Sequence, residues 1–569
     1  MNSLLVDQSG KPLPLPVSQR ARADADWGGP GITYPMSSSL FPYQAANWQT
    51  QEMGDWLPWI RSPDSEINFY RDRMVARSRD LARNDGWASG GITRILDNTV
   101  GAHLRLSANP DYRALAMLSK AKFDATFADE FRRAVEALWR SYSDDLNHYN
   151  DVSRQLTTSQ QLRLGLRHKL IDGDNLFVAY WMPERIGRGA ARYATAFLLV
   201  DTDRLSNPYE MPDSQYLRGG VEIDDDGVPL AYHIRKAHQN DWYNAAESMI
   251  WERVEREDED GWRRVIHDFE RDRAGQNRGV GVFTPVLNHA KMLARYYGVE
   301  LQAAAVASIF GLHVVSPYDP QMIEQAMDTD GAELGFYQNM RADWARDRPA
   351  MLNGVRIPTL APGESINTIS GTHPHTGFID FAHEMLRSIA SCLGVSCEQI
   401  TQDWSKTNYS SARAALLESW KTLTRRATEY KTGTATPYYA CWLHEVMESG
   451  ELDDVLPRGA PDFIDAATAY SRCEWLGVGR GWVDPVKEKQ GAILGLDGGF
   501  STLKRECAEQ GLDWEEVLAQ RSIEVKMFHE NGLPLPDWSG GGLAAGDGPG
   551  GGNGESPQMP RPRNEQSNG

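Results

Sequence analysis

The stretch from Gly377 to Tyr430, GFIDFAHEMLRSIASCLGVSCEQITQDWSKTNYSSARAALLESWKTLTRRATEY, decides the fold of this chain. From Phe378 to Leu393, apolar residues recur at spacings of three and four. This spacing places them on one face of a helix. Gly394 follows at the position where many helices end in a left-handed residue. The pattern therefore predicts a helix that ends at Gly394.

A second helix is predicted after a polar loop. Ser410 is a suitable N-cap, and Gly433 and Pro437 are expected to close the helix. The loop between the two helices, residues 397–408, ends with Asp403, Trp404, Ser405, Lys406, Thr407 and Asn408. On spacing alone, the whole stretch is typical of an ordinary helical hairpin with a surface loop.

Three blocks of this stretch, in the same order, resemble the signature of the lambda family of tailed-phage portal proteins. They are LGVS at 393–396 followed by Glu398-Gln399, NYSSARA at 408–414, and ESW at 418–420. In that family, the first helix is similar to a stem helix, the loop to the tunnel loop facing DNA, and the second helix to the long helix crossing the wing. The resemblance implies that residues 403–408 border a DNA channel.

Composition is ordinary for a globular protein, with 569 residues, 41% hydrophobic and 10% aromatic. The net charge is −19, from 78 acidic and 59 basic side chains. A balance this acidic disfavours general adhesion to phosphate backbones. It suits a conduit through which a polyanion has to slide.

The cysteines indicate a reduced, cytosolic protein. They form an odd set without a C-x-x-C pair, which argues against a disulfide framework or a zinc ribbon: Cys392, Cys397, Cys441, Cys473 and Cys507. No run approaches 18 apolar residues, and residues 1–20 lack the pattern of a signal peptide. We therefore expect a soluble protein with no membrane partner.

The N-terminal half predicts an arm followed by a mixed α/β region. Residues 1–61 are rich in Pro, Gly and aromatics without a period, which is typical of an extended arm wrapping a neighbouring subunit or of a partly disordered tail. Ser62-Pro63 should open a helix that runs to about Asn84. Further helices are expected at 127–142 and 158–171, and strands at 176–181, 194–200, 220–223 and 230–234.

The longest helix is predicted from Thr284-Pro285 to about residue 310. Its buried stripe should include Leu293, Tyr297, Leu301 and Ala304, and small residues in its second half permit close helix approach. With Met385 and Ile389 of the later helix, these residues are predicted to pack a stem.

The expected fold class is α+β and helix-rich. By resemblance, it is a portal fold with an α/β wing, a two-helix stem, a small clip, a long kinked wing helix with a tunnel loop, and a helical crown. The expected divisions are an arm (1–61), wing (62–283), stem helix (284–310), clip (311–370), second stem helix (371–394), tunnel loop (395–409), long wing helix and following helix (410–465), C-terminal helical region (466–537) and a disordered Gly-rich tail (538–569).

The resemblance also implies partners and a location. The family forms dodecameric rings at one capsid vertex of the virion and is assembled in the host cytoplasm. Double-stranded DNA passes the channel during packaging and ejection. Terminase and then head-tail connector proteins dock at the clip, and major capsid and scaffold proteins surround the ring.

Chemical motifs give no positive signal. The sequence has no Walker loop and no G-x-S-x-G elbow, and His373, His375 and His383 match no standard zinc spacing. Asp224–Asp226 lacks the spacing of a calcium loop. We expect no catalytic residue, metal or cofactor. Two alternatives stay open: a Trp-rich acidic hydrolase, with eighteen Trp suited to sugar stacking, and a non-portal structural ring or adaptor protein.

Overall fold

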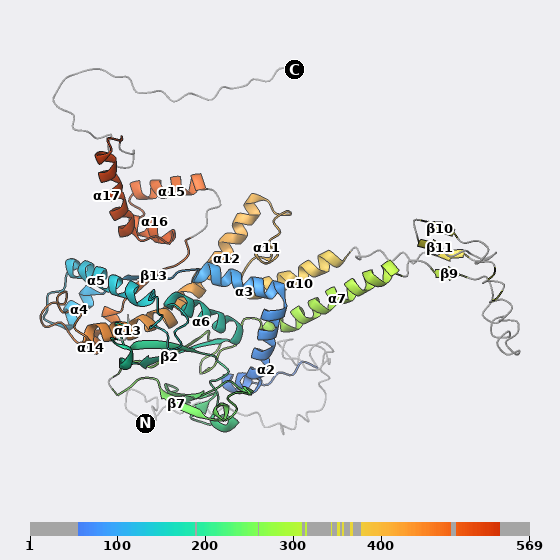
Figure 1. Ribbon diagram of the computed structural model, residues 1–569, viewed down its shortest axis with the longest axis horizontal. Helices are drawn as coiled ribbons and strands as arrows, with labels where there is room; N and C mark the ends of the chain where they lie inside the picture. The colour runs from blue at the N-terminus through green and yellow to red at the C-terminus, as the bar shows by residue number, and fades with distance from the viewer. Residues whose placement is uncertain are drawn as a thin grey trace, which may run out of the picture. The chain divides into compact units, whose positions relative to one another are not determined.

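The computed structural model describes residues 55–187, 191–259, 261–309, 313–315, 339, 343, 350–352, 355–357, 365–367, 377–479 and 485–534. The chain separates into two compact units, Met1–Arg61 and Ser62–Gly569. The predicted arm (1–61) is described only from residue 55 on, and the predicted tail (538–569) lies outside the described residues. Every element below belongs to the second unit and carries its label from Figure 1.

One residue, Asp85, caps both the end of helix α2 and the start of helix α3. The first helix, α2 (Pro63–Asn84), begins as predicted, with the Ser62 side chain accepting a hydrogen bond from the Ser65 N–H. Asp85 ends α2 and caps α3 (Gly86–Thr99), because its carboxylate accepts from the Ala88 N–H at 2.8 Å. Helix α3 was not predicted from the sequence.

Three more helices follow along the chain: α4 (Tyr112–Leu118), α5 (Ala125–Ser143) and α6 (Thr158–Asp172). Helices α5 and α6 match the predicted ranges 127–142 and 158–171, whereas α4 was not predicted. A reciprocal capping box between Thr157 and Gln160 starts α6, and Gly173 ends it with φ of 97°. A Cβ at Gly173 would lie 2.5 Å from the Val280 nitrogen, so only glycine fits there.

The described part of residues 62–283 contains small antiparallel sheets. One has the order β3-β2-β8, with β2 (Asp174–Trp181) between β3 (Thr195–Val200) and β8 (Val265–Phe269). The other has the order β4-β5-β6-β7, from β4 (Leu217–Arg218), β5 (Val221–Ile223), β6 (Pro229–Arg235) and β7 (Trp251–Glu255). The four predicted strands match β2, β3, β5 and β6, whereas β7 and β8 were not predicted. Short 3-10 turns cover Pro183–Arg185, Pro208–Glu210 and Glu247–Met249.

A large aromatic core joins the wing to the C-terminal half. Trp442 is fully buried, and its ring centroid lies 5.0 Å from Trp139 and 5.5 Å from Tyr193. Trp262 and Trp475 are buried in the same cluster. Trp139, Trp262, Trp442 and Trp475 are therefore part of the core.

The long helix does not end where the sequence predicted. It runs from α12 (Tyr409–Tyr430) through a π-helical segment, η6 (Lys431–Ala435), into α13 (Thr436–Glu448). The prediction that Gly433 and Pro437 close it is therefore wrong. Pro437 falls in the first turn of α13, where the π segment has already shifted the hydrogen-bond pattern.

The C-terminal part contains α14 (Phe463–Tyr470), β13 (Cys473–Leu476), α15 (Pro485–Asp497), α16 (Leu503–Glu509) and α17 (Trp514–Glu530). Strand β13 pairs with β1 (Arg105–Ala108), a contact between distant parts of the chain that the sequence did not predict. Helix α17 lies within the region 466–537 that was predicted to be helical. It has no buried residue, and ion pairs such as Arg105–Glu516 at 3.0 Å hold it to the wing.

Most of the predicted clip lies outside the described residues, including the expected short helix near Met322 and the cluster of Trp344 and Arg346. Four of its strands are described. Strand β9 (His313–Val315) pairs with β12 (Ser365–Asn367), and β10 (Ala350–Leu352) pairs with β11 (Val355–Ile357).

Candidate channel loop and stem helices

The two helices that were predicted to form a stem pack against each other through aromatic rings. A 3-10 turn, η5 (Thr284–Val286), leads into α7 (Leu287–Ile309), and α10 (Phe378–Leu393) lies beside it (Figure 1). The Tyr296 ring stacks on Phe378 at 5.3 Å, and Tyr297 meets the same ring edge-on at 5.4 Å. Of the predicted stem residues, Leu293 and Ile389 are buried in the core, and Tyr297 and Met385 pack against it.

Leu301 departs from the prediction. It was expected in the buried stripe of α7, yet 73% of it is exposed in the single chain, and Ala304 is only partly buried. The reason is geometric, because Phe378 starts α10 opposite Tyr296 and Tyr297. Beyond this point, α7 has no α10 residue across from it in the described part of the chain.

The end of α10 is fixed by glycine, as predicted. Gly394 has φ of 70°, and its N–H is bonded to the carbonyl oxygens of Ala390 and Ser391. A Cβ at Gly394 would lie 2.6 Å from Cγ2 of Thr422 on α12. Glycine therefore both ends α10 and lets α12 approach closely.

The predicted polar loop begins with a short helix that the sequence did not indicate, α11 (Cys397–Thr401). A capping box between Ser396 and Gln399 starts it, and Gln402 ends it in the left-handed region with φ of 57°. Ile400 is buried and anchors α11 near Gly91 of α3. Residues 403–408 therefore follow a short helix that is packed against α3.

Residues 403–408 form a self-contained turn. The Asp403 carboxylate accepts from the Ser405 N–H at 3.0 Å, and the Thr407 N–H donates to the Trp404 carbonyl at 3.2 Å. Asn408 caps α12 by accepting from the Ser411 N–H at 2.8 Å. The hydrogen bonds described for these residues join positions no more than four apart, so the loop holds its own shape.

The loop side chains face solvent in the single chain. Asp403, Trp404, Ser405, Lys406 and Asn408 are exposed, and Thr407 is partly buried. Hydrogen bonds from Ser405 lower the pKa of Asp403, so its carboxylate stays ionised at neutral pH. Asp403 and Lys406 thus give the loop one negative and one positive charge.

The long helix is anchored only in its second half. Between Ser410 and Glu418, none of the side chains that the structure describes is buried. Leu423, Ala427 and Tyr430 are buried, and the Tyr430 hydroxyl donates to the Leu162 carbonyl at 2.6 Å. The loop and the first turns of α12 therefore extend from the packed second half of this helix.

The π-helical segment η6, which directly follows α12, also fixes the second half of the long helix. The Lys431 ammonium donates to the Trp475 carbonyl at 3.0 Å, and burial lowers its pKa. The Thr434 hydroxyl donates to Asp268 at 3.0 Å, and Lys169 pairs with the same carboxylate at 2.7 Å. The segment thus ties the long helix to α6 and to the sheet.

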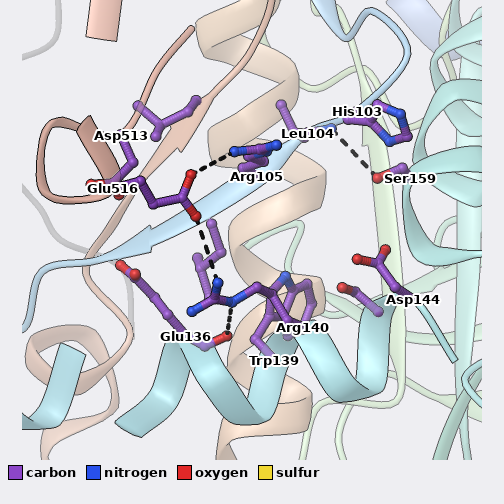
Figure 2. Close-up of a pocket in the computed structure, with 13 residues that line it drawn as sticks. His103, Leu104, Arg105, Glu136, Trp139, Arg140, Asp144, Ser159, Asp513 and Glu516 are labelled. Carbon is purple, nitrogen blue, oxygen red and sulfur yellow. Dashed lines mark hydrogen bonds and ion pairs between the residues drawn. The ribbon is translucent and has the colours of Figure 1, made fainter. Parts of the chain in front are cut away.

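The charged cavity that Figure 2 shows, of about 320 Å³, lies between α5 and α17. The carboxylate of Glu516 pairs with Arg105 at 3.0 Å and with Arg140 at 3.6 Å. Burial raises the pKa of Glu136 to about 7. The cavity is lined by residues of α5, β1 and α17, together with Ser159 of α6 and Leu476 of β13.

Comparison with known proteins identifies the family. Residues 49–426 match the family model described as phage portal protein, lambda family. Portal protein B of Escherichia phage lambda is 32% identical over 506 residues, covering 87% of this chain and 91% of that protein. The portal protein of Escherichia phage N15 is also 32% identical, over 87% of this chain and 92% of its own length.

Solved structures add a distant likeness. A chain in the neck of an empty gene transfer agent particle, computed with C6 symmetry, is 12% identical with a TM-score of 0.39, covering 66% of this chain and 86% of that chain. A chain in the neck of the native particle, computed with C12 symmetry, has a TM-score of 0.34 at the same identity and covers 65% of this chain and 86% of that chain.

A helix-rich α+β chain with two packed stem helices and an exposed loop ahead of a long helix has the architecture of a portal protein. The chain belongs to the lambda family of phage portal proteins. It is a structural component of the virion with a portal role in the capsid. This membership excludes the non-portal adaptor alternative and leaves the hydrolase alternative without support. Among the described helices, none is long and apolar enough to cross a membrane.

Proposed function

We propose that copies of this chain close into a dodecameric ring at one capsid vertex. In this ring, residues 403–408 border a channel through which double-stranded DNA enters during packaging and leaves during ejection. The observation that carries the proposal is the exposed, nearly neutral loop between a stem helix and the long wing helix, in a chain of this family.

Exposed apolar side chains on the stem support the ring. In the single chain, about half or more of each of the following is exposed: Met292, Val299, Leu301, Ile379 and Phe381. Fully burying one such side chain contributes about 1.5–3 kcal/mol. Head-to-tail contact between different faces of identical subunits closes into a ring when the rotation between them divides a full turn. In this arrangement, Leu301 and Ala304 pack against the neighbouring stem.

Electrostatics support the channel. With a net charge of −19, the protein repels a phosphate backbone on average, which keeps DNA mobile. Lys406 and Trp404 provide brief contacts by charge and by stacking. Because the sequence contains no Walker loop, the force for packaging comes from a separate terminase ATPase.

The proposed divisions follow the same scheme. In the proposed ring, the wing (62–283) contacts major capsid and scaffold proteins. The stem (284–310 and 371–394) connects the wing to the clip. The clip (311–370) binds terminase and afterwards head-tail connector proteins. The C-terminal region (466–537) forms the crown. Assembly takes place in the host cytoplasm.

The test removes the two contact side chains of the loop. Trp404→Gly with Lys406→Gly should leave rings intact in electron micrographs and reduce the DNA packaged or retained per particle. The matched control removes the same residue types from the wing surface, Trp242→Gly with Lys236→Gly, and should package normally. Full, stable genomes in the loop variant, or an equal loss in the control, contradict the proposed role of the loop.

A further inference from the structure

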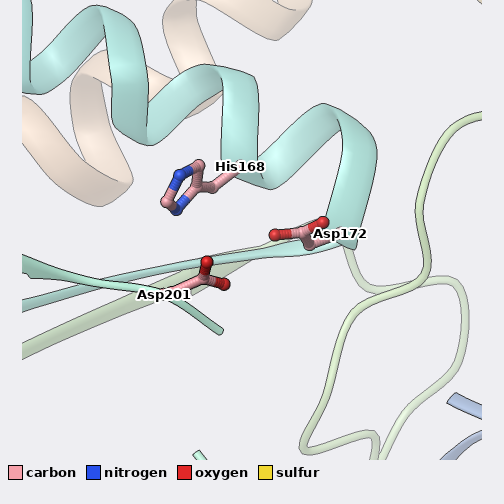
Figure 3. A group of neighbouring side chains, drawn as sticks. All are labelled: His168, Asp172 and Asp201. Atoms are coloured by element: carbon pink, nitrogen blue, oxygen red, sulfur yellow. The ribbon is translucent and has the colours of Figure 1, made fainter. Parts of the chain in front are cut away.

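A group of potential metal ligands lies where α6 meets the end of β3, away from the loop and stem. His168 and Asp172 project from the last turns of α6, and Asp201 directly follows β3 (Figure 3). One ligand atom from each residue lies within 4.8 Å of those from the other two. The spacing of four on a helix puts His168 and Asp172 on one face, and the pairing of β2 with β3 brings Asp201 opposite them.

The carboxylates of this group are unusually concentrated. Asp172 is 3% exposed, and Asp201 and Asp203 lie beside it. Arg79 of α2 donates to both oxygens of Asp172 at 2.8 Å and also pairs with Asp201 and Asp203. Three carboxylates therefore share one guanidinium directly. The neighbouring Arg204 is directed elsewhere, since it donates to the carbonyl oxygens of Arg235 and Lys236.

The imidazole supplies the second, independent observation. Nδ1 of His168 is shielded from solvent and has no hydrogen-bond partner among the residues that the structure describes. In Figure 3, its ring is directed toward the two carboxylates. A buried nitrogen without a partner is unfavourable. Natural proteins leave such groups unsatisfied rarely, and a bound ion is one common explanation.

We propose that His168, Asp172 and Asp201 bind one divalent first-row transition-metal cation, such as Mn²⁺ or Zn²⁺. An imidazole nitrogen with two carboxylates suits these cations, whereas Ca²⁺ and Mg²⁺ prefer oxygen alone. Arg79 then acts as an outer partner that orients the ligating carboxylates. Ligand atoms about 2.1 Å from a tetrahedral ion lie about 3.4 Å apart, so small side-chain rotations close the site.

The cation would hold three elements together. It joins α6 and β3 directly and α2 through Arg79. Binding to the folded state alone raises its stability by mass action. The bound cation would therefore stabilise the contact between α2, α6 and β3. This inference does not depend on the ring or the channel.

Mn²⁺ is the probe of choice, because the five free cysteines could capture the softer Zn²⁺. We expect the metal-stripped full chain to bind one Mn²⁺ per chain in an electron paramagnetic resonance titration, with nitrogen coupling from the imidazole. Mn²⁺ should also raise the midpoint of thermal unfolding. His168→Phe should weaken binding about tenfold or more and abolish the nitrogen coupling.

The matched control is His238→Phe. His238 lies near Asp203 and Asp201 but is half exposed and outside the proposed ligand set. Its replacement should leave affinity and coupling unchanged. Asp201→Asn gives a second test if His168→Phe fails to fold, and it should also weaken binding. Absence of stoichiometric Mn²⁺ binding, binding unaffected by both ligand variants, or loss of the site in His238→Phe would overturn the proposal.

Discussion

Replacing Gly433 by Ala tests whether the π segment is held by close contact with the sheet. A Cβ at this position would lie 2.6 Å from Oδ1 and 2.8 Å from Cγ of Asp268. Asp268 cannot easily move away, because Lys169 pairs with it at 2.7 Å and Thr434 donates to it at 3.0 Å. Both partners would have to shift with it.

The magnitude follows from two opposing effects. Alanine in a helix interior is favoured over glycine by about 1 kcal/mol. Forcing a methyl group into a filled position costs about 1–3 kcal/mol, and the upper part of this range applies where a paired carboxylate is displaced. We therefore expect Gly433→Ala to destabilise the protein by about 1–2 kcal/mol, the reverse of the helix-propensity prediction.

The assay is thermal unfolding of the purified protein under identical conditions. The matched control is Gly90→Ala in α3, where an added Cβ has nothing within 4 Å and should raise stability by about 0.5–1 kcal/mol. The unfolding midpoint should fall for Gly433→Ala and rise for Gly90→Ala. A midpoint for Gly433→Ala at or above that of the wild type refutes the close-contact explanation.

Two further predictions concern the core and the charged cavity. Trp442→Ala should destabilise by about 3–5 kcal/mol because its side chain is fully buried, whereas Trp242→Ala, at 93% exposed, should change stability by less than about 0.5 kcal/mol; denaturant titration compares the two. Burial raises the pKa of Glu136 from 4.5 to about 7, so the folded state binds more protons than the unfolded state between these values. The free energy of unfolding should therefore fall as pH rises from about 4.5 to 7. Glu136→Gln should flatten that part of the pH profile, and an unchanged slope counts against the shifted pKa.

Local signals accounted for the parts of the fold that the sequence predicted. Ser62 caps α2, and Gly394 ends α10 through its positive φ, as the residue types indicated. The exposed position of residues 403–408 also followed from their polarity, but their place at a channel comes from the family resemblance and stays a proposal.

The errors arose where distant residues overrule local preference. Gly433 lies inside a helix because it packs on Asp268, more than 160 positions earlier, which no local pattern reveals. The pairing of β1 with β13 is equally remote in sequence. The same limitation hid the group of His168, Asp172 and Asp201, since Asp201 reaches the other two only through the pairing of β2 and β3.

The most direct test of the central claim is a cryo-electron microscopy map of the purified assembly. We predict a closed twelve-fold ring with an axial hole, with Trp404 and Lys406 of every subunit at its rim and Leu301 packed against the neighbouring stem. A monomer, an open chain of subunits, or a ring that carries residues 403–408 on its outer surface would contradict the account.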